Sequence, residues 1–265
     1  MKPFRIEDIK NILKAYNPPT YIIKRQRSED GVDGRVVAYT DKSSYIAEQY
    51  KVLRTNLYSL SPDKPIRTLV ITSSQAQEGK TITSCNLAIT LSLDKEKKVI
   101  LLDCDLRRPA VHSMFGISRK PGLSDILNNE IDIKNFTEKP AIGDLYLVPS
   151  GTMKSSPSEV LSSTKIKILI DKLKQKFDYI IFDTPPVLNV TDASILGSLC
   201  DAVIFIVKAG TTQKNMIEEA FHMLGEAQIK PKASILTNVH FLLDSYYYFY
   251  SYKYYKYSER KDKEG

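Results

Sequence analysis

The chain has 265 residues, 42% of them hydrophobic, and a formal net charge of +7 at pH 7. These values fit one large α/β domain, alone or with an extension, and exclude a chain too polar to bury a core. No apolar run approaches the roughly 20 residues that cross a bilayer, and the first residues lack the apolar segment of a secretory signal, so we expect the protein in the cytosol. Lys and Arg are spread along the chain, so the charge alone does not indicate nucleic acid and fits an acidic membrane surface or partner at least as well.

The first sixty residues differ from the rest of the chain. Four apolar residues at helical spacing predict a short helix: Ile6, Ile9, Ile12 and Leu13. Pro18 and Pro19 end it, and a polar stretch over residues 25–34 predicts a loop or linker. This helix could dock on the core, contact a partner or lie on a membrane. A second helix is predicted from about Ser44 to Leu60, with four residues on one side: Ile46, Tyr50, Leu53 and Leu57.

From Ile66 onward, apolar segments alternate with helical stretches. The predicted strands are Thr68–Thr72, Val99–Leu102, Leu145–Val148, Tyr179–Phe182, Ala202–Val207 and Ser234–Leu236. Several are almost wholly apolar, which is typical of strands covered on both faces. The pattern predicts an α/β fold with a mostly parallel sheet flanked by helices.

A phosphate-binding loop is predicted at Ser74–Thr81, between the first of these strands and a helix that opens near Gly79. Backbone N–H groups of such a loop and helix N-terminus point at phosphates. Gly79 lets the main chain approach closely, Lys80 supplies a positive charge, and the Thr81 hydroxyl can ligate Mg²⁺. Ser74 stands where a first glycine is usual. The expected nucleotide-binding residues are Ser74, Gln75, Ala76, Gln77, Glu78, Gly79, Lys80, Thr81 and Ile82.

Two further apolar strands end in acids. Asp103 and Asp105 follow one strand, and Asp183 follows another. In an open α/β sheet, ligands collect at the carboxyl ends of the strands, so these carboxylates can hold a metal directly or through water. Each acid could instead be a helix cap or turn former. Three acids in register with a phosphate loop favour the metal site.

The loop, the element Asp103-x-Asp105-x-Arg107 and the element Asp183-Thr-Pro-Pro resemble the bacterial tyrosine kinases of capsule and exopolysaccharide synthesis. These kinases carry Walker A, Walker A′ and Walker B motifs, followed by a C-terminal tyrosine cluster. The resemblance covers roughly Ser44 to Tyr257 and includes two further segments, Gly122-Leu-Ser-Asp-Ile-Leu and Ser156-Pro-Ser-Glu-Val-Leu. It implies a P-loop NTPase fold of the deviant Walker A class, with ATP and Mg²⁺ as cofactors, and a protein-tyrosine kinase activity.

The resemblance also implies roles for individual residues. Lys80 contacts the phosphates, Thr81 and Asp183 hold Mg²⁺, and Asp105 lies near the metal. Asp103 acts as the base toward the tyrosine hydroxyl. An Asp near Mg²⁺ should have a lowered pKa, so it would orient the phenol more than act by strong basicity. Positioning and electrostatic stabilisation would supply most of the rate. Arg107 either neutralises charge or braces the loop.

Two positions depart from the family pattern. Gln77 stands where many members have glycine, which makes the loop less permissive there. Some members use a Glu-x-x-Arg-x-x-Arg motif on an early helix for ring assembly, and the matching residues here are Glu48, Lys51 and Arg54. Lysine keeps the charge of arginine but loses its bidentate fork. Assembly through this helix is still expected.

The last twenty residues hold half of the 16 tyrosines of the chain, in a stretch that cannot be a core. The resemblance implies that these are the phosphate acceptors, reached by a neighbouring active site: Tyr246, Tyr247, Tyr248, Tyr250, Tyr252, Tyr254, Tyr255 and Tyr257. Each phosphate adds about −1.5 to −2 charges, so several would make the basic tail strongly acidic and could dissolve a ring. The alternative is an aromatic low-complexity tail that stacks on a partner.

The expected organisation is an N-terminal helix and linker (1–43), a kinase domain with the assembly helix (44–242) and a solvated tyrosine-rich tail (243–265). The resemblance implies a homo-oligomer, a membrane-bound polysaccharide chain-length regulator whose cytoplasmic tail activates the kinase, and a cognate tyrosine phosphatase. No nucleic-acid partner is expected. The protein would then lie at the inner face of the membrane through its partner.

Two alternatives stay open. A partition or site-placement ATPase of the same P-loop class would carry a signature Lys early in the loop, where this chain has Gln75. A nucleotide-gated scaffold would not need its acids, but Asp103, Asp105 and Asp183 are all present.

Overall fold

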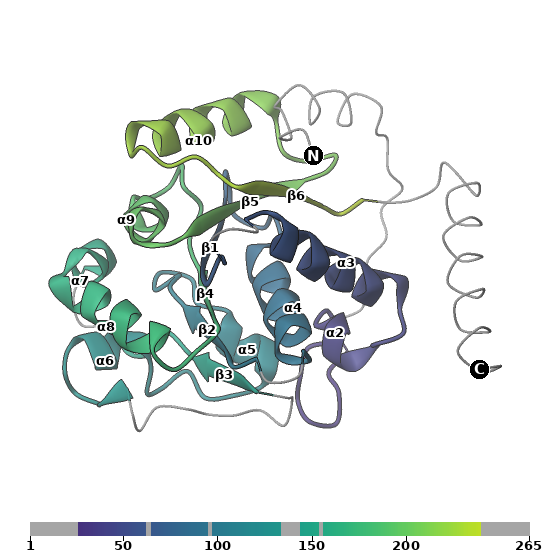
Figure 1. Cartoon of the computed structure of the whole chain (residues 1–265), viewed down its shortest axis with the longest axis horizontal. Helices are drawn as coiled ribbons and strands as arrows, with labels where there is room; N and C mark the ends of the chain where they lie inside the picture. The colour runs from purple at the N-terminus through teal and green to yellow at the C-terminus, as the bar shows by residue number, and fades with distance from the viewer. Residues whose placement is uncertain (1–25, 62–64, 95–96, 134–143, 154–155, 240–265) are drawn as a thin grey trace.

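The computed structural model describes residues 26–61, 65–94, 97–133, 144–153 and 156–239. One six-stranded sheet runs through it in the order β3-β2-β4-β1-β5-β6, with every pairing parallel. The strands are β1 (Thr68–Ser73), β2 (Val99–Asp103), β3 (Leu145–Val148), β4 (Tyr179–Asp183), β5 (Ala202–Lys208) and β6 (Ala233–Thr237). All six predicted strands and the α/β fold class are confirmed (Figure 1).

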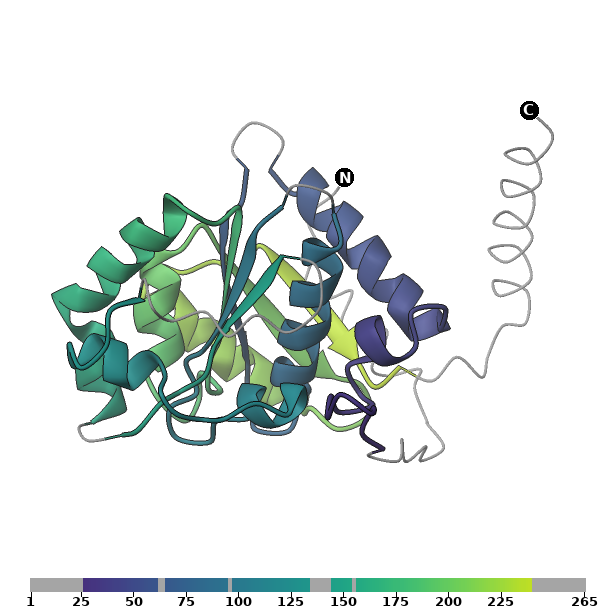
Figure 2. The ribbon, with the colours of Figure 1, turned by 90° about the horizontal axis from the view of Figure 1, so that it is seen from below.

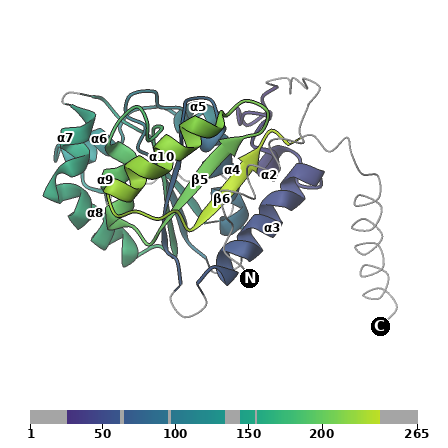
Figure 3. The same ribbon diagram turned by 90° about the horizontal axis from the view of Figure 1, so that it is seen from above.

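Helices cover both faces of the sheet (Figures 2 and 3). One face carries α2 (Val37–Thr40), α3 (Tyr45–Ser59), α4 (Lys80–Ser92) and α5 (Val111–Phe115). The other carries α6 (Leu123–Leu127), α7 (Pro157–Ser162), α8 (Thr164–Lys174), α9 (Asp192–Leu199) and α10 (Lys214–Glu226). Successive strand residues point to opposite faces, so Leu69 packs under α4 while Val70 faces the other helices. This double cover explains why the strand sequences are almost continuously apolar.

The predicted second helix is α3, which begins after Ser44, whose Oγ accepts a hydrogen bond from the Ala47 N–H at 3.2 Å. Ala47 and Leu57 are buried on its inner side. The prediction that Ile46 shares this side is wrong, because Ile46 is 44% exposed. The small side chain next to it, Ala47, is the one that faces the core.

The segment before α3 belongs to the same core, where Val32, Val36 and Ala38 are buried with α4 and α5. Asn86 of α4 joins the two parts: its Oδ1 accepts from the Ala38 N–H at 2.9 Å, and its Nδ2 donates to the Arg35 carbonyl at 3.0 Å. The helix predicted around Ile6–Leu13 and the tyrosine tail lie outside the described residues. Among the residues described, no helix is long and apolar enough to span a membrane.

Candidate active site

The phosphate loop and the strand-end acids meet at the carboxyl ends of three adjacent strands. β4 lies between β2 and β1, and its last residue, Asp183, is the register partner of Asp103 on β2. The loop leaves β1 and leads into α4. The loop and the two acids therefore lie at the same edge of the sheet, the edge at which open α/β sheets bind their ligands.

The loop turns sharply into α4 through two residues with positive φ. Gly79 has φ 98° and is the residue before the first turn of the helix. A side chain at this position would adopt a conformation that glycine alone tolerates easily. Gln77 has φ 64°, so the departure from glycine noted in the sequence leaves a non-glycine residue in the left-handed region.

Lys80 lies across the loop. Its Nζ donates to Ser73 Oγ at 3.0 Å and to the Gln75 carbonyl at 3.3 Å, and the residue is only 7% exposed. Burial lowers the pKa of Lys80, and the negative charges of Asp183, Asp105 and Glu78 oppose that shift. The ammonium group is therefore held inside the loop, and its contact with phosphates stays a prediction.

Asp183 accepts hydrogen bonds from two hydroxyls on α4. Thr81 Oγ1 donates to Oδ2 at 2.6 Å, and Ser84 Oγ donates to Oδ1 at 2.9 Å. Burial raises the pKa of Asp183 to about 6, although the Thr81 hydrogen bond and the Lys80 charge favour the carboxylate. Two of the predicted metal ligands, Thr81 and Asp183, are thus in direct contact.

Asp103 is fully buried at the end of β2. Its Oδ2 accepts from the N–H groups of Ala110 and Val111, each at 3.0 Å, and its Oδ1 has no hydrogen-bond partner. Burial, with the negative charge of Asp183 next in size, raises the pKa of Asp103 well above its usual value. The direction is opposite to the lowered pKa expected from the sequence, because the carboxyl group is buried beside a second acid. A buried carboxylate oxygen without a partner is costly, so the site holds an unused acceptor.

Arg107 contacts α7 and α9. Its Nη2 donates to Ser158 Oγ of α7 at 3.0 Å, and its Nε lies 3.5 Å from Oδ2 of Asp192, a fully buried residue of α9. Ser158 Oγ donates to the other oxygen of Asp192 at 2.7 Å. Of the two roles left open by the sequence, these contacts favour bracing. Asp105 accepts from the Arg108 N–H at 2.9 Å and so shapes the same loop.

The oxygen groups at this edge fit a magnesium ion. Mg²⁺ prefers oxygen ligands and is usually bound by one or two carboxylates together with substrate phosphates. The Thr81 hydroxyl and the Asp183 carboxylate supply oxygen ligands of this kind. In the part of the chain that the structure describes, no group of three or more His, Cys, Asp or Glu side chains is placed to hold a metal by itself.

Comparison with known proteins relates this site to a reaction. The sequence matches the AAA domain family over residues 66–235. It is 34% identical to the tyrosine-protein kinase YwqD of Bacillus subtilis (strain 168). The alignment spans 218 residues and covers 82% of this chain and 92% of that protein. The chain belongs to the bacterial tyrosine-protein kinases. The kinase is also 32% identical to the tyrosine-protein kinase CpsD of Streptococcus agalactiae, over 72% of this chain and 83% of that protein.

Solved structures agree with this assignment. The kinase domain of Escherichia coli tyrosine kinase ETK has a TM-score of 0.76 at 25% identity, over 84% of this chain and 87% of that one. The chimerical protein CapA2B2 has a TM-score of 0.74 at 25% identity, over 88% of this chain and 98% of that one. The cell division ATPase MinD of Pyrococcus furiosus has a TM-score of 0.54 at 23% identity and shares the fold alone.

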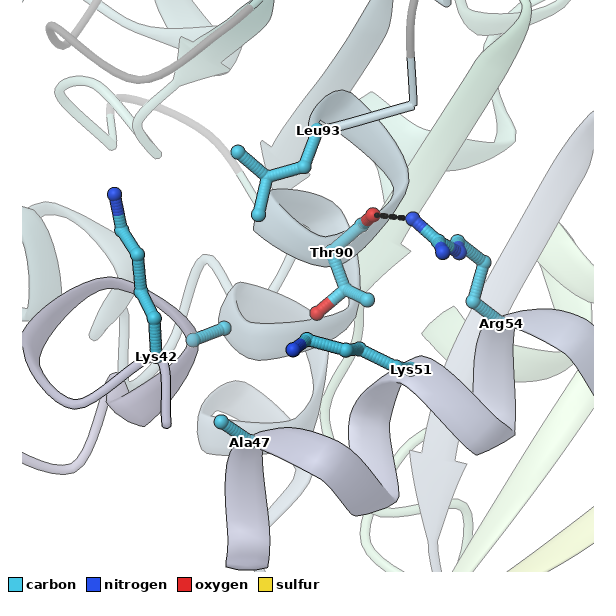
Figure 4. Close-up of a pocket in the computed structure, with 7 residues that line it drawn as sticks. Lys42, Ala47, Lys51, Arg54, Thr90 and Leu93 are labelled. Carbon is cyan, nitrogen blue, oxygen red and sulfur yellow. Dashed lines mark hydrogen bonds between the residues drawn. The ribbon is translucent and has the colours of Figure 1, made fainter. Parts of the chain in front are cut away.

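The expected assembly residues of the kinase lie on α3. Lys51 pairs with Glu48 on the same helix. Arg54 Nη1 donates to the Thr90 carbonyl of α4 at 3.0 Å, as Figure 4 shows. Lys51 and Arg54, with Lys42, line a cavity of about 100 Å³ between α2, α3 and α4. Thr90 is ten residues along α4 from Lys80, or about 15 Å, so this cavity is separate from the phosphate loop.

Five contributors to the site were not foreseen from the sequence. Ser73 accepts from Lys80, and Ser84 donates to Asp183. The others are Ser158 and Asp192, which contact Arg107, and Thr212, which donates to the Glu78 carboxylate of the phosphate loop. Ser84 carried a usable signal, because it follows Lys80 by one helical turn and shares its face. Ser158 and Asp192 stand in family-like or helix-opening segments, but their contact with Arg107 depends on how loops from distant strands meet. Thr212 gave no signal at all.

Proposed function

We propose that this kinase phosphorylates its own C-terminal tyrosine cluster, in trans within an oligomer, and thereby regulates capsular or exopolysaccharide synthesis and chain length. The observation that carries the proposal is the contact of Thr81 with Asp183 beside the free oxygen of Asp103. A phosphate loop, a metal-binding pair and a buried acceptor of protons lie within one strand-end site. The chain also supplies eight tyrosines in the tail as acceptors.

Each residue has a distinct task in the proposed reaction. Lys80 binds the phosphates of ATP through its buried ammonium group, and Thr81, Asp183 and Asp105 hold Mg²⁺. When bound, Mg²⁺ neutralises charge on the phosphate oxygens. The tyrosine oxygen forms a bond to the γ-phosphorus, the bond from that phosphorus to the bridging oxygen of ADP breaks, and the phenolic proton passes to Asp103 Oδ1.

The state of Asp103 suits a proton acceptor of this kind. Burial and the neighbouring Asp183 raise the pKa of Asp103, and a carboxylate with a raised pKa is a stronger base. The N–H groups of Ala110 and Val111 hold its other oxygen, so the carboxylate keeps one orientation. Because Asp103 is fully buried, the acceptor hydroxyl has to approach it at the carboxyl ends of β2 and β4.

The proposed oligomer assembles through α3, which presents Glu48, Lys51 and Arg54 near one side of the molecule. Tyrosines of one copy then enter the site of a neighbour. Phosphorylation converts the tail of each copy into an acidic segment, and the resulting repulsion disassembles the oligomer. A cognate phosphatase reverses the change.

The proposed partner is a membrane-bound chain-length regulator that activates the kinase through its cytoplasmic tail and holds it at the inner membrane face. The match to the tyrosine-protein kinase wzc of Salmonella typhi supports this view. That alignment is 29% identical and covers 83% of this chain but only 31% of that protein. The kinase domain therefore occurs within a longer protein in one relative and over nearly the whole length of YwqD in another.

The test is phosphotyrosine mass spectrometry on the full chain, incubated with ATP and Mg²⁺ alone and with a candidate activator tail. Lys80→Met and Asp103→Asn should abolish the modification. Lys176→Met, at an exposed lysine far from the loop, should leave it unchanged. Phosphate confined to the eight tail tyrosines of the active proteins would establish the function. ATP hydrolysis without phosphotyrosine under any condition would refute it in favour of a switch ATPase.

A further inference from the structure

The carboxylate of Glu78 is buried inside the phosphate loop. The residue is 3% exposed, and both carboxylate oxygens lie 3.0 Å from Ser74 Oγ. Oε2 also accepts from the Gln75 N–H at 2.9 Å. A carboxylate in a loop that binds phosphates repels the ligand. We therefore expect Glu78 to have a structural role that offsets this cost.

The same carboxylate joins the loop to a neighbouring turn. Thr212, in the turn between β5 and α10, is 7% exposed and donates its hydroxyl to Glu78 Oε1. Thr212 Oγ1 accepts in turn from the Lys208 N–H at 3.0 Å. The backbone carbonyl of Glu78 accepts from Thr237 Oγ1, at the end of β6, at 2.7 Å. One residue therefore connects the loop after β1 to the ends of β5 and β6.

The places of β5 and β6 in the sheet indicate which part of a nucleotide the Glu78 link would orient. β1 lies between β4 and β5 in the sheet. The β4 and β2 side carries Asp183 and Asp103, the groups assigned to the metal and the acceptor. That leaves the other side of the loop, at the ends of β5 and β6, for the nucleoside of a bound nucleotide.

We propose that Glu78 and Thr212 are a positioning pair that fixes the distance between the phosphate loop and the β5–α10 turn, and so selects a nucleoside triphosphate over bare polyphosphate. This inference rests on nucleotide binding at the loop. Hydrogen bonds to a carboxylate are stronger than neutral ones, so the pair can hold two segments in one arrangement.

The contacts predict a selective defect. If Thr212 loses its hydroxyl, Glu78 keeps its hydrogen bonds from the Ser74 hydroxyl and the Gln75 N–H. The loop should therefore retain its shape and its affinity for phosphates. The turn loses its link to the loop, and with it the correct distance for the nucleoside. Binding of ATP should therefore weaken while binding of tripolyphosphate should not.

The experiment is titration calorimetry of the full chain with Mg-ATP and, separately, with Mg-tripolyphosphate. Thr212→Val should weaken ATP binding about tenfold, the loss of one charge-assisted hydrogen bond, and change tripolyphosphate binding less than about twofold. Thr212→Ser keeps the hydroxyl and should restore ATP binding. Thr211→Val is the matched control, because Thr211 is exposed in the same turn, and it should bind both ligands as the wild type does.

A second variant separates this role from general support of the turn. If Thr212 acts through Glu78, then adding Thr212→Val to Glu78→Gln should weaken ATP binding no further than Glu78→Gln alone. Additive losses would overturn the inference, as would an equal loss for both ligands or no loss in Thr212→Val. A wild type that binds tripolyphosphate as tightly as ATP would overturn the inference but leave kinase activity open. A wild type that binds neither ligand would remove the proposed function as well.

Discussion

Thr81 and Asp183 lie 102 residues apart in the chain, yet the Thr81 hydroxyl donates a 2.6 Å hydrogen bond to the Asp183 carboxylate. The contact joins the first turn of α4 to the end of β4 and so ties the phosphate loop to the strand-end acids. Ser84 repeats the link one turn further along the helix. Any change at this junction should therefore act on metal binding and on stability together.

Thr81→Val removes the hydroxyl and keeps the shape of the side chain. Loss of a hydrogen bond that orients a metal ligand typically costs about 10- to 100-fold in metal affinity. We expect the Mg²⁺ concentration for half-maximal autophosphorylation to rise by about that factor, while Thr81→Ser stays close to the wild type. An unchanged Mg²⁺ requirement in Thr81→Val would rule out a role for Thr81 at the metal.

As the pH rises from about 4 to about 6, the free energy of unfolding of the metal-free protein should decrease. Burial raises the pKa of Asp183 to about 6, whereas an unfolded Asp titrates near about 3.9. Below both values the carboxyl is protonated in both states. Between them the unfolded state ionises first, so the free energy of unfolding falls by about 1.4 kcal/mol per pH unit.

Urea unfolding without Mg²⁺ or nucleotide, from pH 4.5 to 7.5, measures this effect. Asp183→Asn has no proton to lose at this position, so its stability should decline less steeply than that of the wild type. The gap between the two curves should change by about 2 kcal/mol, in favour of the variant, over this range. Parallel curves would show that Asp183 ionises normally in the folded state.

Gln77→Gly should stabilise the protein. A non-glycine residue in the left-handed region costs roughly 1–2 kcal/mol, and the extra entropy of glycine in the unfolded chain offsets about half of that. We expect a gain of about 0.5–1 kcal/mol in thermal unfolding of the nucleotide-free protein. Gln75→Gly, in the same loop but without a positive φ, should lose stability by a similar amount. Shifts of the same sign in both variants would contradict the strain at Gln77.

Arg107→Ala should lower the rate of autophosphorylation but change ATP affinity less than about twofold. The guanidinium is held by Ser158 and Asp192, so we expect it to act through the position of this loop. Because the Arg107 side chain is 40% exposed but its partner Asp192 is fully buried, its loss leaves a buried carboxylate oxygen without a partner and should cost about 1–3 kcal/mol of stability. Asp192→Asn should share this behaviour, and the double variant should be no worse than either one. A clear loss of ATP affinity in Arg107→Ala would instead support charge neutralisation.

Lys51→Arg should strengthen self-association, because arginine restores the fork that lysine lacks. Arg54→Ala should weaken it, and also removes the hydrogen bond to Thr90. Sedimentation velocity at several concentrations measures both changes. Exposed Lys42→Ala, near the same cavity but outside the motif, is the control and should leave the association unchanged. An oligomer unaffected by either α3 substitution would place the assembly surface elsewhere.

The fold and the centre of the site follow from local sequence patterns. Core strands were located because apolar segments of suitable length alternate with helices, and their ends shifted by only a residue or two, as when β1 continues to Ser73. Asp103 and Asp183 could be brought together because carboxyl ends of parallel strands share an edge. The bond between Glu78 and Thr212 spans 134 residues and depends on the shape of two loops, for which no periodic pattern exists. The orientation of Arg107 was ambiguous for the same reason.

The packing of residues before the sheet sets the smallest piece of this kinase that can be produced as a stable protein. The family match begins at residue 66. However, the side-chain amide of Asn86 on α4 hydrogen-bonds to the backbone of Ala38 and Arg35, and the Thr90 carbonyl accepts from Arg54. A chain cut at residue 66 would strip these partners from buried polar groups and uncover the apolar side of α4. Truncated versions for crystallography or screening should therefore begin no later than Arg27, whose backbone forms an isolated antiparallel β-bridge with that of Asp33.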